Sequence, residues 1–141
     1  MKTAPQTGPF SSVPALQEAS QLALDVVNDS QKIRRNKAAF KRLTTDASEF
    51  VDDMSHFYRI MEEQFPQGVP EDLDFVFQRT VNLLTSLRSF TRDVALRNFF
   101  MAILFSRSDV REVKTYDQTL AMIRGSFKVY FRTTDFHVLG F

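Results

Sequence analysis

The stretch from Ile33 to Phe65 constrains the fold most, because its apolar residues recur every seven positions. Counting in sevens from the start meets only apolar residues: Ile33, Phe40, Ala47, Met54 and Met61. A second apolar row lies three positions further on (Leu43, Phe50 and Phe57), and the opposite face is polar. The pattern predicts a bundle helix with a wide apolar face. At 1.5 Å per residue it would be roughly 50 Å long and would need partners of similar length.

Three other segments show helical spacing of apolar residues. The first begins at Ser12-Val13-Pro14, where proline suits a first turn, and ends at the break Asn28-Asp29-Ser30. The turn-rich segment 66–70 separates the long helix from the next one, which we expect to begin at Pro70. The last helix follows the break at 106–109 and runs to about Phe131.

Two places along the chain are less regular. Around 91–95 the apolar pattern loses phase, so we expect a bend or a separate short helix. The residues that then resume the apolar face are Leu96, Phe99, Phe100, Ile103 and Leu104. Before the last helix, Asp109 with Glu112 three residues later resembles a capping box, although Ser108 could equally be the cap.

Short connections between long amphipathic helices favour antiparallel neighbours. The sequence therefore predicts an all-α fold, an up-down antiparallel four-helix bundle with an extra short helix. We expect residues 1–12 to be a flexible leader and residues 13–132 to form the bundle domain. Residues 133–141 would be a tail that packs on the bundle or leads into a missing module. A chain of 141 residues suffices for one domain with a sizeable core.

Composition argues against several classes of protein. Without cysteine there is no disulfide, no cysteine-bound zinc and no thiol catalysis. No apolar run reaches the roughly 18 residues of a membrane span, and residues 1–12 lack the apolar core of a signal peptide. Asp53 and His56 have the spacing of half a metal site, but the motif occurs once, on a polar face. We therefore expect no metal site, cofactor, catalytic residue or enzymatic activity.

Charge is unevenly distributed, although the formal net charge is only +1. Residues 32–42 hold six basic residues and no acid, whereas residues 46–74 hold nine acids and one arginine. If the chain folds back at Gly68, Arg92 and Arg97 approach the same end, with the start of the last helix. These charges oppose the helix dipole at ~0.3–1 kcal/mol each, so stability alone does not explain them.

We interpret this end as a site for an anionic surface, and the neutral overall balance favours lipid over nucleic acid. The alternative is that these cations are solvated or paired with acids of neighbouring helices. The candidate lipid-binding residues are Lys32, Arg34, Arg35, Lys37, Lys41, Arg42, Arg88, Arg92 and Arg97. A second basic stripe, Arg124, Lys128 and Arg132, would lie toward the acidic end, where we expect intramolecular pairing.

Several short motifs occur in the order found in a known family. They are Val13-Pro14-Ala15-Leu16, Asn36-Lys37, Lys41-Arg42-Leu43, Val69-Pro70-Glu71-Asp72-Leu73 and a basic-aromatic segment at 88–105. From residue 13 to residue 132 the chain resembles the amino-terminal helical domain of mixed lineage kinase domain-like (MLKL) proteins, in particular the fungal HeLo-like branch. In the family a pseudokinase or other regulatory module follows this domain, so the sequence to Phe141 would be an excised domain of such a protein or a protein that is regulated differently.

The resemblance implies a bundle that acts in programmed cell death. Such a domain binds anionic lipids, phosphoinositides among them, then oligomerises and perturbs the membrane, and the six cations at 32–42 match the family's basic segment. The alternative is a non-lytic signalling adaptor that binds a helical protein partner through the aromatic residues near Phe99 and Phe100. In either case we expect a cytoplasmic protein. If it binds lipids, we expect it to be recruited to the plasma membrane.

Overall fold

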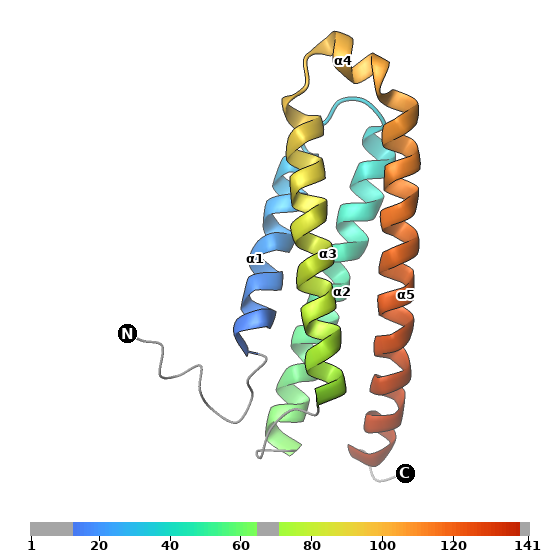
Figure 1. Cartoon of the computed structure of the whole chain (residues 1–141). Coiled ribbons are helices and arrows are strands. Elements are labelled where there is room, and N and C mark those ends of the chain that lie inside the picture. Colours follow the sequence, from blue (N-terminus) through green and yellow to red (C-terminus); the bar gives the residue numbers. More distant parts are fainter. Residues whose placement is uncertain (1–12, 65–70, 139–141) are drawn as a thin grey trace, which may run out of the picture.

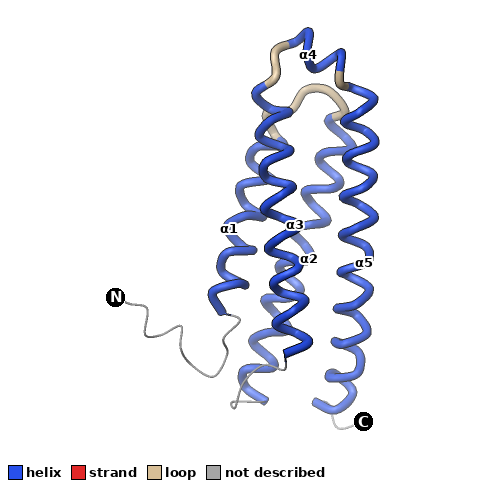
Figure 2. The backbone as a smooth tube through the Cα atoms, in the orientation of Figure 1, coloured by secondary structure: helices blue, strands red, loops and turns tan. Residues whose placement is uncertain are grey.

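The computed structural model describes residues 13–64 and 71–138, and this part of the chain contains helices and no strand (Figures 1 and 2). The helices are α1 (Val13–Ser30), α2 (Lys37–Gln64), α3 (Glu71–Leu96), α4 (Phe99–Leu104) and α5 (Ser106–Val138). The predicted all-α fold is confirmed. Four long helices form the bundle, and the short α4 crosses one end of it (Figure 1).

The direction of the chain alternates from each long helix to the next (Figure 1). Helix α1 packs against α2 and α3, and α5 also packs against α2 and α3. Consecutive helices α2 and α3 therefore lie on a diagonal of the bundle and meet through core side chains. The rings of Phe40 and Phe90, for example, lie 5.5 Å apart between centroids. The predicted up-down bundle is thus observed, although α2 and α3 are not the adjacent pair that their short connection predicts.

The heptad face of α2 forms the centre of the core. Every apolar residue of the two predicted rows is at most 2% exposed: Ile33, Phe40, Leu43, Ala47, Phe50, Met54, Phe57 and Met61. Phe127 of α5 meets the rings of Phe50 and Phe57 edge-on, with centroids 5.4 Å apart in both pairs. Since a fully buried Phe side chain contributes about 1.5–3 kcal/mol, this aromatic seam is a main source of stability.

Three predicted boundaries differ from the structure. Helix α1 continues through the expected break at 28–30, because Asn28 is exposed in its last turn and the buried Ser30 finds hydrogen-bond partners. The Ser30 hydroxyl donates to the carbonyl oxygen of Val27 at 2.8 Å. Helix α2 begins at Lys37, not Ile33, and Ile33 is buried in the connection before it. Helix α3 runs through the bend considered at 91–95, because Thr91 and Val94 keep contact with the core. The alternative, a separate short helix, is the one observed, as α4.

The predictions for the end of the chain also need correction. Helix α5 begins at Ser106, so neither Ser108 nor Asp109 is its cap, and Asp109 lies within the first turn. The same helix extends to Val138, so residues 133–138 of the expected tail are helical. The predicted leader at 1–12, most of the turn at 66–70 with Pro70, and residues 139–141 lie outside the described residues.

Candidate functional site

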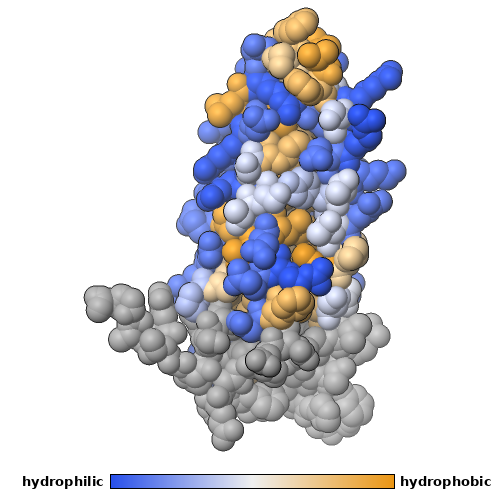
Figure 3. Space-filling view, in the orientation of Figure 1, coloured by the Kyte–Doolittle hydropathy of each residue, from blue (hydrophilic) through white to orange (hydrophobic). Residues whose placement is uncertain are grey.

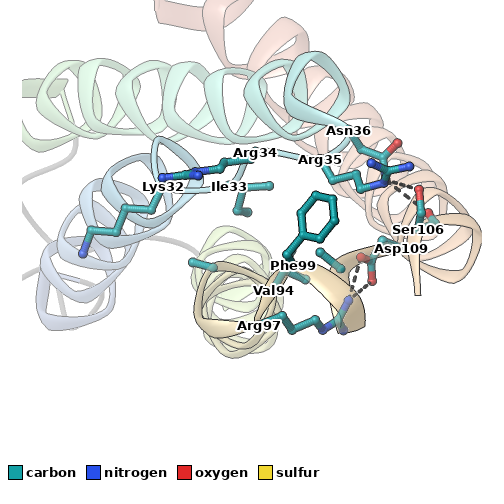
Figure 4. A pocket seen from close by; sticks show the side chains of 12 residues that line it. Lys32, Ile33, Arg34, Arg35, Asn36, Val94, Arg97, Phe99, Ser106 and Asp109 are labelled. Carbon is teal, nitrogen blue, oxygen red and sulfur yellow. Dashed lines mark hydrogen bonds and ion pairs between the residues drawn. The ribbon is translucent and has the colours of Figure 1, made fainter. Parts of the chain in front are cut away.

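One end of the bundle carries an open cavity of about 750 Å³ (Figure 4). Its walls are the connection between α1 and α2, the end of α3, the helix α4 and the start of α5. Cationic side chains (Lys32, Arg34, Arg35 and Arg97) and apolar ones (Ile33, Val94, Ala95, Phe99 and Ala102) both line it. The Phe99 ring projects into the cavity between Arg35 and the ion pair of Arg97 with Asp109 (Figure 4).

Asn36 shapes the connection that carries three of these cations. Its φ of 59° is in the left-handed region, which Asn adopts more readily than most residues. The side-chain amide donates to the carbonyl oxygen of Ser106 at 3.1 Å and to its hydroxyl at 3.3 Å. The Asn36 carbonyl oxygen accepts the first backbone bond of α2, from Phe40. This residue therefore fixes the connection to the start of α5.

The six cations of residues 32–42 form what we call the basic rim. Lys32, Arg34 and Arg35 lie in the connection, and Lys37, Lys41 and Arg42 lie on the first turns of α2. All six residues are exposed. None of them takes part in the ion pairs found among the side chains that the structure describes, those of residues 14–63 and 73–128. The basic rim therefore has its charge available to an external anion.

The other three candidate residues are paired within the bundle. Arg88 lies 3.5 Å from Asp25, and Arg92 lies 3.0 Å from Asp29, so both bind α1. Arg97 binds both carboxylate oxygens of Asp109, at 2.7 and 2.6 Å. These acids offset much of the charge that the three guanidinium groups could present to an anionic surface. The end of the bundle thus contains both arrangements that the sequence left open.

The Arg97–Asp109 pair ties the end of α3 to the start of α5 beneath α4. Asp109 is 3% exposed, and the Arg97 side chain is 16% exposed. Burial by itself would lower the pKa of Arg97, but hydrogen bonds and attraction from Asp109 and Asp93 outweigh it and raise the pKa. The Arg97 guanidinium also lies 4.9 Å from the Phe105 ring centroid. The base of the α4 crossing is therefore a charged, largely dehydrated contact.

The charge of Arg42 acts on Asp117 of α5, although these two residues form no ion pair. Burial raises the pKa of Asp117, and repulsion from Asp46 raises it further, whereas Arg42 acts in the opposite direction. Arg42 therefore moderates a crowded pair of carboxyl groups as well as belonging to the basic rim. A charge reversal at this position would disturb the bundle as well as the rim.

The apolar residues around α4 do not resume the core face, contrary to the sequence prediction. Six of them are exposed and form what we call the α4 corner: Leu96, Phe99, Phe100, Ile103, Leu104 and Phe105. Their exposed fractions range from 37% at Phe105 to 85% at Leu96, and no residue of α4 is buried. The corner forms the orange cap at the end of the molecule, bordered by blue side chains (Figure 3).

A sequence signal for this surface was present. Residues 99–105 are apolar without exception, so the segment has no polar face for solvent. A helix of this kind belongs in a core or against another apolar phase. The spacing of these residues predicts a core position, because spacing by itself fits a buried helix face.

The half of the bundle away from α4 has a smaller cavity and fewer candidate functional residues. A smaller cavity of about 240 Å³ lies between Phe50, Asp53, His56, Arg124, Phe127 and Lys128. Arg124 and Lys128 take part in no ion pair among the described residues, so the expected pairing of the second basic stripe is not seen there. The side chain of Arg132 lies outside the described part. No group of three metal-ligating side chains occurs where side chains are described, and His56 is exposed.

In the described portion of the chain, every helix is too short or too polar to cross a membrane. Comparison with protein-family models, with curated proteins and with solved structures finds no match to this chain.

Proposed function

We propose that this chain attaches to anionic lipid membranes through its basic rim. The observation that carries the proposal is that six exposed cations gather at one end of the bundle and have no ion pair within the described residues. Near an anionic bilayer each Lys or Arg contributes on the order of 1 kcal/mol, and this attraction decays over the Debye length of about 10 Å at 0.1 M salt. Several cations acting together would give reversible, salt-sensitive binding.

We further propose a role of the MLKL type in programmed cell death. Two features support it: the order of the motifs from Val13 to Arg132, and a bundle of four long helices with a short helix at one end. Under this proposal the protein is cytoplasmic and binds the plasma membrane on activation. There it oligomerises and makes the bilayer leak. The lipid would be an anionic phospholipid such as phosphatidylserine or a phosphoinositide.

Co-sedimentation with vesicles tests the lipid-binding step. Arg34→Glu with Arg35→Glu reverses two charges of the basic rim, whereas Arg59→Glu with Lys128→Glu makes the same charge change elsewhere on the exposed surface. We expect the rim variant to lose most of its binding to phosphatidylserine vesicles, and the control variant to bind within about twofold of the wild type, because screening confines the attraction to nearby charges. Equal binding by both variants would refute the proposal.

Release of an entrapped dye from the same vesicles tests the membrane-perturbing step. Release should need anionic lipid, should rise more steeply than linearly with protein concentration if oligomers form, and should be absent in the rim variant. Binding without release at any concentration would retain the lipid-binding function and rule out the lytic one.

A non-lytic adaptor is the second candidate function, and the exposed α4 corner is the observation that favours it. Apolar patches on a soluble domain commonly bind another protein, and a helical partner could cover Phe99 and Phe100. This function predicts a stoichiometric complex with one protein and no affinity for vesicles. Tight, salt-sensitive binding to vesicles by the purified chain alone would count against it.

A further inference from the structure

We propose that the α4 corner is a wedge that enters the bilayer interface once the basic rim has attached. The inference rests on the proposed lipid-binding function and deepens it by naming the part of the protein that leaves water. The occupant of this apolar surface would be the acyl region of an anionic membrane, not a protein groove or a second copy of the chain.

The location of the corner is the first argument. Helix α4 crosses the extreme end of the bundle, beyond the connection between α1 and α2 (Figures 1 and 2). A flat surface approaching along the bundle axis from this end would meet α4 first. The apolar side chains would therefore lie deepest, and the basic rim would lie one layer behind, at the depth of the lipid headgroups.

The charge around the corner is the second argument. Segments 31–42 and 96–111 together contain nine Lys or Arg residues and one Asp. That acid is Asp109, which is buried against Arg97. An apolar patch inside a cationic border matches a surface that is anionic outside and apolar within, as an acidic bilayer is. Two copies of the chain joined through this corner would bring two cationic borders together, which disfavours self-association there.

The third argument is that the corner is preformed and independent of the core. Asn98 caps α4, because its side-chain oxygen accepts a hydrogen bond from the backbone of Met101 at 2.8 Å. The backbone of Phe105 donates to the Met101 carbonyl oxygen at 3.0 Å, and the backbone of Asp109 donates to Phe105 at 2.8 Å. The backbone of this segment thus has internal hydrogen bonds, as contact with the hydrocarbon region of a membrane requires. Since α4 buries no side chain, polar substitutions there leave the core intact.

A tryptophan probe tests insertion directly. The chain contains no tryptophan, so Phe100→Trp places a single reporter on the exposed surface of α4. We expect its emission to shift to the blue and to be quenched by lipids brominated along the acyl chain, in phosphatidylserine-containing vesicles but not in pure phosphatidylcholine. Unshifted, unquenched emission from protein that co-sediments with the vesicles would overturn the wedge while leaving the lipid-binding function standing.

A pair of matched variants measures the contribution of the wedge. Phe99→Ser with Phe100→Ser should lower the vesicle partition coefficient about tenfold or more, as expected for removing two partly inserted aromatic side chains. Leu24→Ser with Met122→Ser removes two apolar side chains of similar exposure far from the corner and should leave partitioning unchanged. Both variants should unfold at the wild-type temperature. Equal partitioning by the two would overturn the wedge.

The salt dependence of binding distinguishes the electrostatic contribution of the basic rim from the apolar contribution of the α4 corner. Binding that survives in high salt should depend on Phe99 and Phe100, because apolar insertion is not screened, whereas binding at low salt should also depend on Arg34 and Arg35. If none of the four substitutions weakened binding, the lipid-binding function would fail together with the wedge. If the purified chain ignored vesicles and bound a helical protein through Phe99 and Phe100, the corner would be a protein-docking surface instead.

Discussion

Replacing Asp109 with asparagine should weaken the base of the α4 crossing. The variant Asp109→Asn keeps the size of the side chain and a hydrogen-bond acceptor, and removes the charge that Arg97 binds at 2.7 and 2.6 Å. Breaking a fully buried ion pair costs about 3–5 kcal/mol, and breaking an exposed one costs about 0.2–1 kcal/mol. Arg97 is 16% exposed and retains Asp93 at 3.2 Å. We therefore expect an intermediate loss of about 2–3 kcal/mol.

Urea unfolding followed by circular dichroism measures this loss as the change in the free energy of unfolding. The matched control is Asp93→Asn, which removes the exposed partner of Arg97. Because the Asp93 side chain is 72% exposed, this substitution should lower the free energy of unfolding by only about 0.3–0.5 kcal/mol. A double-mutant cycle with Arg97→Met then isolates the coupling between Arg97 and Asp109, for which we expect at least about 1 kcal/mol.

The location of the loss is as informative as its size. If the pair holds only the α4 crossing, amide hydrogen exchange at residues 98–106 should accelerate in Asp109→Asn more than exchange in the middle of α2. A variant that unfolds within about 0.5 kcal/mol of the wild type, with unchanged exchange at the crossing, would refute the view that this pair secures the α4 corner.

Three further predictions concern the core and the titrating groups. Phe57→Ala should lower the free energy of unfolding by about 3–5 kcal/mol in urea, because the ring is 1% exposed and packs edge-on against Phe127. Asp117→Asn should stabilise the bundle at pH 7 by up to about 1 kcal/mol, because burial and repulsion raise the pKa of this carboxyl in the folded protein. The fold favours the protonated form of this carboxyl, so the gain should shrink as the pH falls through the raised pKa and should be absent below the ordinary value of 3.8. Equal unfolding temperatures of the variant and the wild type at pH 7 would contradict the pKa shift. Burial, with a smaller effect of Glu62, raises the pKa of Tyr58 to about 12, so its contribution to stability is complete below pH 10 and is lost as the pH rises toward 12. The free energy of unfolding of the wild type should therefore fall between these two pH values by roughly 2–3 kcal/mol more than that of Tyr58→Phe. Parallel curves of unfolding free energy against pH for the two proteins would contradict this.

The sequence was sufficient for the fold because the heptad pattern depends on geometry alone. A residue repeated every seven positions faces the same side of a helix, so Phe40, Met54 and Met61 had to share a buried face. Helix ends were harder to predict. Ile33 belongs to the heptad pattern and is buried, yet it precedes α2, because Asn36 in the left-handed conformation turns the chain just before the helix.

The candidate site was only partly predictable. That the basic rim lies at one end follows from the alternation of the helices, since short connections bring residues 32–42, the end of α3 and the start of α5 together. Which cations are paired could not be read from the sequence. Arg88 and Arg92 meet Asp25 and Asp29 only because α3 packs beside α1, a neighbour relation that sequence order does not specify.

The α4 corner was misplaced for a different reason. Its apolar spacing fits a helix that continues the α3 face, and periodicity cannot tell a buried apolar helix from an exposed one. The distinction comes from the turn at Arg97 and Asn98, where the chain leaves the bundle and α4 lies across its end.

The central claim is tested most directly by the vesicle partition coefficient of the purified chain, measured with and without phosphatidylserine at low and high salt. Attachment through the basic rim predicts strong partitioning only when anionic lipid is present, a fall as salt rises, and a loss in Arg34→Glu with Arg35→Glu that Arg59→Glu with Lys128→Glu does not share. Equal partitioning into neutral and anionic vesicles, or none into either, would contradict it.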